Sequence, residues 1–403
     1  MHRTLSHPIA TLAALSLSLP VGAAAATVTV SAGDFDREHT VVTFQLPESS
    51  GQLRQLETPS GDRLPLQIDT NGQGSFILPK LAKNASLKLK LIPEAPENFH
   101  GVQARRADRT LEFQQGGRSI ARYQAEPSDL PRANINPIYR RGGYLHPIQS
   151  PSGTVVTGDY PANHVHHHGI WFPWTKTQFQ GREPDFWNMG QGSGTVEFVG
   201  LDSSWSGPVH AGFTSRHRFV DLIPEEPVTA LHESWEVKVY RVEGNPAPYH
   251  QFDLVSTQTC ATSDPLILPE YHYGGLGFRG HWDWNGAENT RFLTSTGETD
   301  RVRGNTSRAR WCHIGGKVGD QLTGIAILGH PDNFRAPQPM RLHPTEPFFC
   351  FAPEQLGDMR IEPGQPYVSR YRFIVADGPP NAERIDRLWN DYAHPPTVVV
   401  QSP

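Results

Sequence analysis

The sequence contains only three cysteines, Cys260, Cys312 and Cys350, and no Cys-x-x-C pair. Three cysteines exclude a disulfide framework, although one bridge with one remaining thiol stays open. The missing Cys-x-x-C pair argues against a cysteine-based zinc or iron–sulfur site. A basic block is also missing, and 41 acidic residues against 36 Lys and Arg argue against a nucleic-acid partner.

Long apolar runs and two common catalytic motifs are absent as well. No run beyond residue 26 approaches the roughly 18–20 apolar residues that a membrane-spanning helix needs. The sequence has no Gly-x-Ser-x-Gly nucleophile elbow, and its glycine cluster lacks a Walker lysine. Acid–base chemistry by histidine and carboxylates is therefore better supported than serine-hydrolase or phosphate-loop chemistry.

The first 26 residues read as a secretory signal. Arg3 gives a basic start, residues 9–21 form a short apolar stretch, and residues 22–26 supply small residues for cleavage. We therefore expect a soluble protein that is exported to the periplasm or secreted.

Most of the remaining chain alternates apolar and polar residues, which predicts an all-β protein. Trp235, Val237 and Val239 alternate with more polar neighbours, and residues 367–375 alternate in the same way. Residues 252–259 are polar on both faces, so we expect one side of that strand to line a wet cleft. Runs of about 8–10 residues exceed the usual strand length and predict large antiparallel sheets.

One helix and two domains are predicted. The helical spacing of apolar residues between Ile385 and Tyr392, with Asn381 at the N-cap position, predicts a helix near the C-terminus. Short strands and turn residues indicate a small β-sandwich-like N-terminal domain over residues 27–98. The main domain is expected over residues 99–397.

Histidine is clustered, because His164, His166, His167 and His168 fall within five positions. If this run is extended, His164, His166 and His168 point to one face and His167 to the other. Imidazoles so placed suit zinc, copper or iron, and they equally suit substrate contacts and proton transfer near neutral pH. The His-x-His pair with a following Glu that a cupin metal site requires is absent.

Other polar segments and several tryptophans accompany this run. Residues 270–279 join a Gly-rich turn to Arg279, and residues 330–335 form a polar turn. Flat indole rings mixed with His, Asp, Glu and Arg are typical of a sugar-binding cleft, although each ring could equally belong to the core. The tryptophans beside these polar segments are Trp171, Trp174, Trp187, Trp282 and Trp284.

Segments 159–172, 274–279 and 330–333, with the C-terminal helix, resemble the bacterial PmoA-like family, often labelled "methane oxygenase PmoA". The His-His-x-Gly-Ile-Trp-Phe motif is the most specific part, and the resemblance covers most of the chain after residue 26. It implies a large antiparallel β-supersandwich similar to galactose mutarotase, with a small N-terminal β domain and a C-terminal helix. In that fold, sugars bind on a concave sheet face. The chain departs from the family at His272, where many members carry Lys-Glu, so Glu270 is only a substitute for that acid.

We predict an exported carbohydrate-active protein, a hydrolase, lyase or epimerase that uses acid–base chemistry on a sugar or glycan. Arg279 would hold an anionic or hydroxyl-rich group, because its planar guanidinium suits bidentate contacts, and Trp171 and Trp187 would stack on the sugar. The catalytic candidates are His166, His167, His168, Glu270 and Asp185. The substrate-binding candidates are His146, His164, Trp171, Trp187, His272, Arg279, His330, Asn333 and Arg335.

Two alternatives remain open. One is a metal-dependent oxygenase with copper, iron or zinc on His164, His166 and His168, although the lack of apolar spans does not fit a membrane methane monooxygenase. The other is a glycan-binding protein without catalytic activity. The oligomeric state is not predicted.

Overall fold

The computed structural model describes residues 26–46, 53–92, 94, 101–244 and 247–401. Within these ranges nearly half of the residues lie in strands and few lie in helices, and the sheets are antiparallel, which confirms the predicted all-β fold. The predicted signal sequence lies outside these ranges apart from Ala26. No helix of the described ranges is long and apolar enough to cross a membrane.

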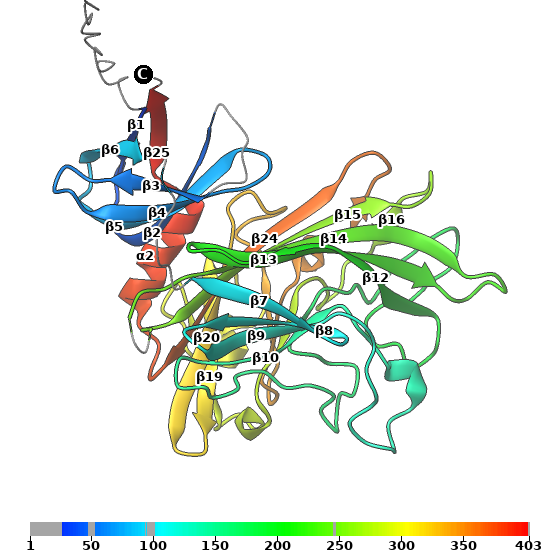
Figure 1. The fold of residues 1–403 in the computed structure, drawn as a ribbon. Coiled ribbons are helices and arrows are strands. Elements are labelled where there is room, and N and C mark those ends of the chain that lie inside the picture. Colours follow the sequence, from blue (N-terminus) through cyan, green and yellow to red (C-terminus); the bar gives the residue numbers. More distant parts are fainter. Residues whose placement is uncertain (1–25, 47–52, 93, 95–100, 245–246, 402–403) are drawn as a thin grey trace, which may run out of the picture.

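Two eight-stranded sheets pack face to face and form the main body (Figure 1). The first sheet, in the order β21-β22-β17-β11-β10-β9-β8-β7, contains β7 (Val102–Ala107), β8 (Thr110–Gln115), β9 (Arg118–Gln124), β10 (Tyr144–Ile148), β11 (Ile170–Trp171), β17 (Gly277–Arg279), β21 (Met340–Leu342) and β22 (Phe348–Phe351). The second sheet, in the order β12-β13-β14-β15-β24-β20-β19-β18, contains β12 (Gly194–Trp205), β13 (His210–Asp221), β14 (Val228–Tyr240), β15 (His250–Cys260), β18 (Thr290–Thr294), β19 (Trp311–Val318), β20 (Gln321–Gly329) and β24 (Tyr367–Asp377). The remaining elements of the body are the pair β16 (Leu266–Leu268) and β23 (Met359–Ile361), the helix α1 (Arg301–Gly304), and the 3-10 helices η1 (Pro137–Tyr139), η2 (Trp282–Trp284) and η3 (Pro353–Leu356).

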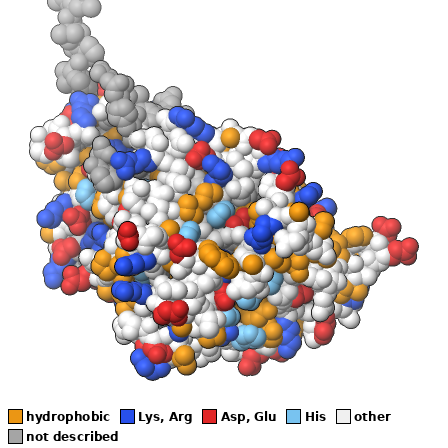
Figure 2. All heavy atoms as spheres, turned by 90° about the horizontal axis from the view of Figure 1, so that it is seen from below, with side chains coloured by type: hydrophobic (Ala, Val, Ile, Leu, Met, Phe, Trp, Pro, Cys, Tyr) orange, Lys and Arg blue, Asp and Glu red, His pale blue; other side chains and the backbone are white. Residues whose placement is uncertain are grey.

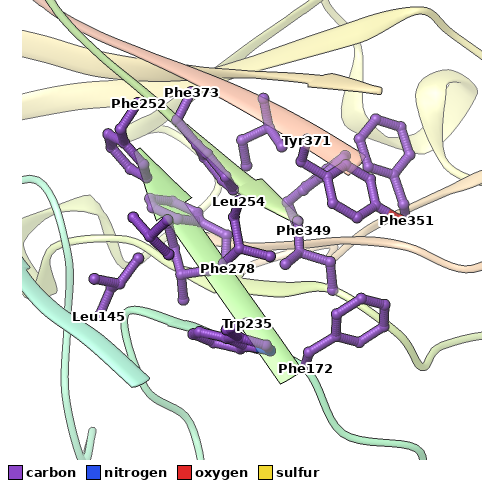
Figure 3. Close-up of a cluster of buried hydrophobic side chains, with 14 of the residues drawn as sticks. Leu145, Phe172, Trp235, Phe252, Leu254, Phe278, Phe349, Phe351, Tyr371 and Phe373 are labelled. Carbon is purple, nitrogen blue, oxygen red and sulfur yellow. The ribbon is translucent and has the colours of Figure 1, made fainter. Parts of the chain in front are cut away.

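Side-chain alternation gives the first sheet two distinct faces. Leu145, Phe278 and Phe349 point into the core between the sheets, where Trp235 and Leu254 of the second sheet lie (Figure 3). Their neighbours along each strand therefore point away from this core. We call this opposite side the outer face. The residues that it carries include Tyr144, His146, Trp171, Arg279 and Phe348.

A third sheet, in the order β2-β5-β4-β3-β6-β1-β25, has a small core of its own. Its strands are β1 (Thr27–Ser31), β2 (Arg37–Gln45), β3 (Leu53–Glu57), β4 (Arg63–Ile68), β5 (Gln73–Leu81), β6 (Ser86–Ile92) and β25 (Thr397–Gln401). Six strands come from the segment predicted as the N-terminal domain, whereas β25 returns from the other end of the chain and pairs with β1 (Figure 1). Hydrogen bonds connect all the described strands of this segment into one sheet.

The predicted C-terminal helix is confirmed as α2 (Ala382–Ala393). The Asn381 side chain accepts a hydrogen bond from the Arg384 N–H at 2.9 Å, which satisfies an otherwise free helix donor. Ile385, Leu388 and Trp389 are buried in a cluster that also contains residues of β19, β20 and β24. Figure 1 shows α2 between the third sheet and the main body.

The predicted strands at residues 235–240, 252–259 and 367–375 lie within β14, β15 and β24. Of the two polar faces predicted for residues 252–259, the face that carries Ser256 and Gln258 does not line a wet cleft. Ser256 and Gln258 are fully buried, and both donate hydrogen bonds to Oε1 of Glu233, at 2.5 and 2.9 Å. A buried carboxylate, instead of solvent, satisfies the polar face of this strand.

Candidate functional site

The clustered histidines lie against the outer face of the first sheet, in a segment that we call the histidine turn (residues 159–168). Backbone N–H groups of His164 and His167 donate to the carbonyl oxygens of Pro161 and His164, at 3.2 and 2.8 Å. The run is therefore not extended, and the two-faced arrangement that an extended run would give does not form, because successive turns fold the chain back on itself. The imidazoles of one segment consequently pack on each other and on the sheet.

His168 is the most deeply buried of these imidazoles, and a carboxylate orients it. Its Nδ1 lies 2.6 Å from Oδ1 of Asp159, and the Tyr144 hydroxyl donates to Oδ2 of the same group at 3.0 Å. Burial lowers the pKa of His168, although Asp159 opposes this effect. The neutral ring thus donates its Nδ1 proton to Asp159, which leaves Nε2 as an acceptor, and Nε2 is buried without a protein partner. An imidazole held in this way is arranged as a general base.

The other three imidazoles form a stacked group in front of the sheet. The ring centroids of His164 and His167 lie 4.8 Å apart, and His167 stacks on Phe348 at 4.9 Å. His166 meets His164 and His167 edge-on and remains half-buried. Burial, together with the neighbouring His164 and His168, lowers the pKa of His166 to about 3. Burial also lowers the pKa of His164 and His167, so these rings are neutral near pH 7.

Arg279 of β17 brings a cation to the same place, although it is only 1% exposed. Its Nη2 donates to Oδ1 of Asn285 at 2.7 Å and to Oε2 of Glu346 at 2.8 Å. Its Nε and Nη1 have no protein partner, so three of the five guanidinium N–H groups remain free. Burial lowers the pKa of Arg279, against the effect of Glu346. The charge of Arg279 in turn lowers the pKa of His164.

Buried polar atoms without partners therefore gather on this part of the outer face. Besides Nε and Nη1 of Arg279, they include Nε2 of His168 and Nδ1 of both His164 and His167. Such atoms are rare in folded proteins because each one costs free energy, and a bound molecule or water commonly satisfies them. Figure 2 shows histidine side chains at separate places on the surface seen from below, among hydrophobic and charged side chains. We treat the histidine turn and Arg279 as the candidate site.

The two tryptophans predicted to stack on a sugar do not present a ring to solvent. Trp171 and Trp187 are fully buried, with ring centroids 5.0 Å apart. They pack beneath the histidine turn, where Trp171 lies 5.1 Å from His167. Their predicted role is corrected to support of the turn. Trp282 is the only one of the five tryptophans beside polar segments that is exposed, at 55%.

The predicted carboxylate partners lie elsewhere. Oδ1 of Asp185 accepts hydrogen bonds from the backbone N–H groups of Trp187 and Asn188, so Asp185 fixes the turn that carries Trp187. Glu270 is exposed, and its backbone N–H donates to Asp358. No described contact joins either carboxylate to a histidine of the turn. The carboxylate bonded to a histidine there is Asp159.

The remaining predicted residues fall into two groups. His146 lies on the outer face with Nδ1 2.9 Å from the hydroxyl of Thr157, and Asp159 acts on its pKa, which burial lowers. His272 is exposed, and its ring packs 4.7 Å from Tyr273, which contacts Trp187. His146 thus adjoins the candidate site, whereas His272 is connected to it only through Tyr273 and Trp187.

No described contact connects the candidate site with His330, Asn333 or Arg335. His330 and Asn333 line a separate hollow of about 150 Å³ beside Trp389. Asn333 exchanges two hydrogen bonds of 2.8 Å with the backbone of Arg370. Arg335 donates to the carbonyl oxygens of residues 353 and 357, at the ends of η3. Asn333 and Arg335 therefore hold the loops that they join.

Within the described ranges, no group of three or more His, Cys, Asp or Glu side chains is arranged to hold a metal ion. The three cysteines are free thiols, so the single bridge left open by their number is not formed.

The sequence analysis missed a second polar network, which lies in the core between the sheets. The Tyr123 hydroxyl lies 2.7 Å from Nε2 of His217, whose Nδ1 lies 2.9 Å from Oε2 of Glu233. All three side chains are buried. Glu233 was detectable, because it falls in phase with Trp235 on the inward side of β14.

Comparisons with known proteins give a family but no activity. No curated protein matches the sequence. Among solved structures, a glycosyl hydrolase family 38 protein from Enterococcus faecalis matches at 10% identity and a TM-score of 0.43, over 94% of this chain and 47% of that chain. An alpha-mannosidase from Enterococcus faecalis V583 matches at 10% identity and a TM-score of 0.44, over 94% of this chain and 46% of that chain. This chain spans about half the length of these two proteins, and likeness at this level transfers no activity to it.

The remaining comparison concerns the sequence of the main domain. The profile of a family of unknown function (DUF6807) matches residues 110–390, a range that holds the histidine turn and Arg279. It does not name the PmoA-like family, so that resemblance stays a prediction. Because the match covers well over half of the chain, the protein belongs to the family of unknown function DUF6807.

Proposed function

We propose that the outer face of the first sheet binds a carbohydrate and that imidazoles of the histidine turn transfer protons on it. The observation that carries the proposal is the convergence of unpartnered, buried nitrogen atoms of Arg279 and of the histidine turn. Sugar hydroxyls both donate and accept hydrogen bonds. Neutral imidazoles and free guanidinium N–H groups are complementary to them.

The site residues take different roles in this proposal. His168 is the base, because Asp159 holds its Nδ1 and leaves Nε2 free to accept a proton. His166 is half-buried and neutral, so it serves as the second proton carrier on the solvent side. Arg279 binds a hydroxyl, or an oxygen on which negative charge develops.

The carboxylates of the site favour lyase or epimerase chemistry over hydrolysis. Most glycoside hydrolases place two carboxyl groups on opposite sides of the scissile bond. Here Asp159 is engaged by His168 and Tyr144, and Glu346 is engaged by Arg279. In the proposed reaction, Nε2 of His168 takes a proton from the sugar. His166 then relays a proton from solvent: its neutral ring takes up a water proton on one nitrogen as it gives the N–H proton of the other nitrogen to the opposite side of the same atom or to a leaving oxygen. His168 afterwards releases its proton to solvent.

The test is incorporation of deuterium from D₂O into mono- and oligosaccharides, neutral and acidic, followed by NMR. We expect exchange at a sugar carbon or formation of an unsaturated or epimeric product. His168→Gln should lower the rate by about 100-fold or more, because proton transfer by a positioned base contributes that much. His232→Ala, on the exposed side of β14, is the matched control and should leave the rate unchanged.

Circular dichroism and thermal unfolding would first establish that the His168→Gln protein is folded. Full activity of the folded variant would overturn the role of His168. Sugar binding without exchange or product would instead favour a glycan-binding protein that lacks catalytic activity.

A further inference from the structure

We propose that Trp282 forms an outer subsite that stacks on a second sugar unit, so that the ligand is an oligosaccharide rather than a monosaccharide. This inference rests on the proposed function and specifies the substrate class of the same site.

The first observation is the exposure of the ring. Trp171, Trp174, Trp187 and Trp284 are each 0% exposed, whereas Trp282 is 55% exposed. A tryptophan that leaves half of its surface in water gives up the free energy that its burial would contribute. The fold therefore does not need this indole as a core residue, although its neighbour Trp284 serves as one.

The second observation is that the backbone beneath the ring is fixed. Trp282 begins η2, and Nδ1 of His281 accepts a hydrogen bond from the next N–H, that of Asp283, at 3.1 Å. The carbonyl oxygen of Trp282 accepts from both the backbone and the side chain of Asn285, at 3.0 and 2.8 Å. A flat ring on a fixed backbone loses little conformational entropy when a ligand stacks on it.

The third observation connects η2 to the candidate site. The same Asn285 that holds Trp282 accepts a hydrogen bond from Nη2 of Arg279 at 2.7 Å. The N–H of His281 donates to the carbonyl oxygen of Val156 at 3.0 Å, on the segment that leads into the histidine turn. Only two residues thus separate Arg279 from Trp282, and the hydrogen bond of His281 ties this stretch to the segment that precedes Asp159.

The polar surroundings of the ring identify its partner as a sugar. His281, Asp283 and Asn285 flank Trp282, and Asp283 is exposed. A protein-binding surface usually presents a contiguous apolar patch. A single indole beside a carboxylate and an amide matches a pyranose, whose C–H face is apolar and whose edge carries hydroxyls.

The experiment compares ligand length in wild type, Trp282→Ala and Trp282→Phe. Dissociation constants are measured by calorimetry for two series of probes: galacturonic acid with its di- and trisaccharides, and glucose with its β-1,4-linked di- and trisaccharides. In wild type we expect the disaccharide of the bound series to bind about tenfold more tightly than the monosaccharide, as one added stacking contact gives. Trp282→Ala should remove that gain and leave monosaccharide affinity within twofold. Trp282→Phe should keep part of the gain.

Val302→Ala, which truncates another highly exposed apolar side chain, is the control and should retain the full gain. If the monosaccharide binds but added units bring nothing, or if the gain persists in Trp282→Ala, the subsite is overturned and the proposed function stands. If no member of either series binds, the result contradicts both the subsite at Trp282 and the proposed function.

Discussion

Gly277 lies at the start of β17, where two indole rings pack against the outer face of the first sheet. A Cβ atom at this position would lie 3.0 Å from the ring of Trp187 and 3.1 Å from that of Trp171. Because both rings are fully buried, neither can move aside freely. We expect Gly277→Ala to destabilise the protein by about 1–3 kcal/mol, as overpacking of a core does. Equilibrium denaturation in urea measures this change.

The matched control is Gly200→Ala in β12. The new Cβ there meets only the end of the flexible Arg216 side chain, at 3.2 Å. A loss of stability as large as that of Gly277→Ala would show that the strand glycine itself, rather than the two rings, sets the cost.

Individual residues of the candidate site could be named from the sequence, but their contacts could not. The clustered histidines and Arg279 were detectable because rare, chemically active residues stand out against an apolar background. Their partners depend on the fold: Asp159 reaches His168, nine positions along the chain, only because the intervening residues form turns, and Glu346 reaches Arg279 from 67 positions away. No local pattern encodes such pairs.

Among the elements, α2 connects the two ends of the described chain through a buried ion pair. Arg37 of β2 donates from Nη1 to Oδ1 of Asp391 at 3.0 Å, and Thr40 donates to Oδ2 of the same carboxylate at 3.0 Å. Removing one member of a buried pair leaves the other charge buried without a partner. We therefore expect Asp391→Ala to lower the free energy of unfolding by about 3–5 kcal/mol, measured by urea denaturation.

A double-mutant cycle tests the origin of that loss. Arg37→Leu/Asp391→Leu removes both charges together and should recover a large part of the stability. If the loss of stability in the double variant equals the sum of the losses in the two single variants, the ion pair is not the cause.

Strands and helix were predictable from periodicity, but their pairing was not. The spacing of its apolar residues predicts α2, and the alternation of apolar and polar residues predicts β14. One of the two partners of β1 is β25, whose Val400 pairs with Val28 across 372 positions of sequence, and nothing near either strand specifies this pairing. For the same reason, the sequence did not show that the face of β15 with Ser256 and Gln258 is buried, because Glu233 satisfies it from another strand.

For the whole molecule, several buried histidines couple stability to pH. Burial lowers the pKa of His313 to about 4 and that of His210 to about 3, against about 6.5 in the unfolded chain. The unfolded state therefore binds protons more readily. The stability that these two neutral histidines contribute is fully present above pH 6.5 and is lost as the pH falls toward their folded-state pKa. Between pH 7.5 and pH 5, each of these two residues should cost about 2 kcal/mol.

Urea denaturation at a series of pH values measures this dependence. Between pH 6.5 and pH 5, His313→Asn should reduce the slope of the unfolding free energy against pH by the equivalent of about one bound proton. This holds whatever the stability of the variant is at pH 7.5. An unchanged slope would contradict the assignment to His313.

The pairing of β1 with β25 also has a consequence for synthesis. The ribosome makes β1 among the first strands and β25 after every other described strand, with 374 positions between the paired residues Thr27 and Gln401. While translation proceeds, the third sheet lacks one edge strand, and the open edge of β1 offers unpaired backbone groups to other chains. The nascent protein thus carries an edge prone to association, which is covered only when β25 has emerged.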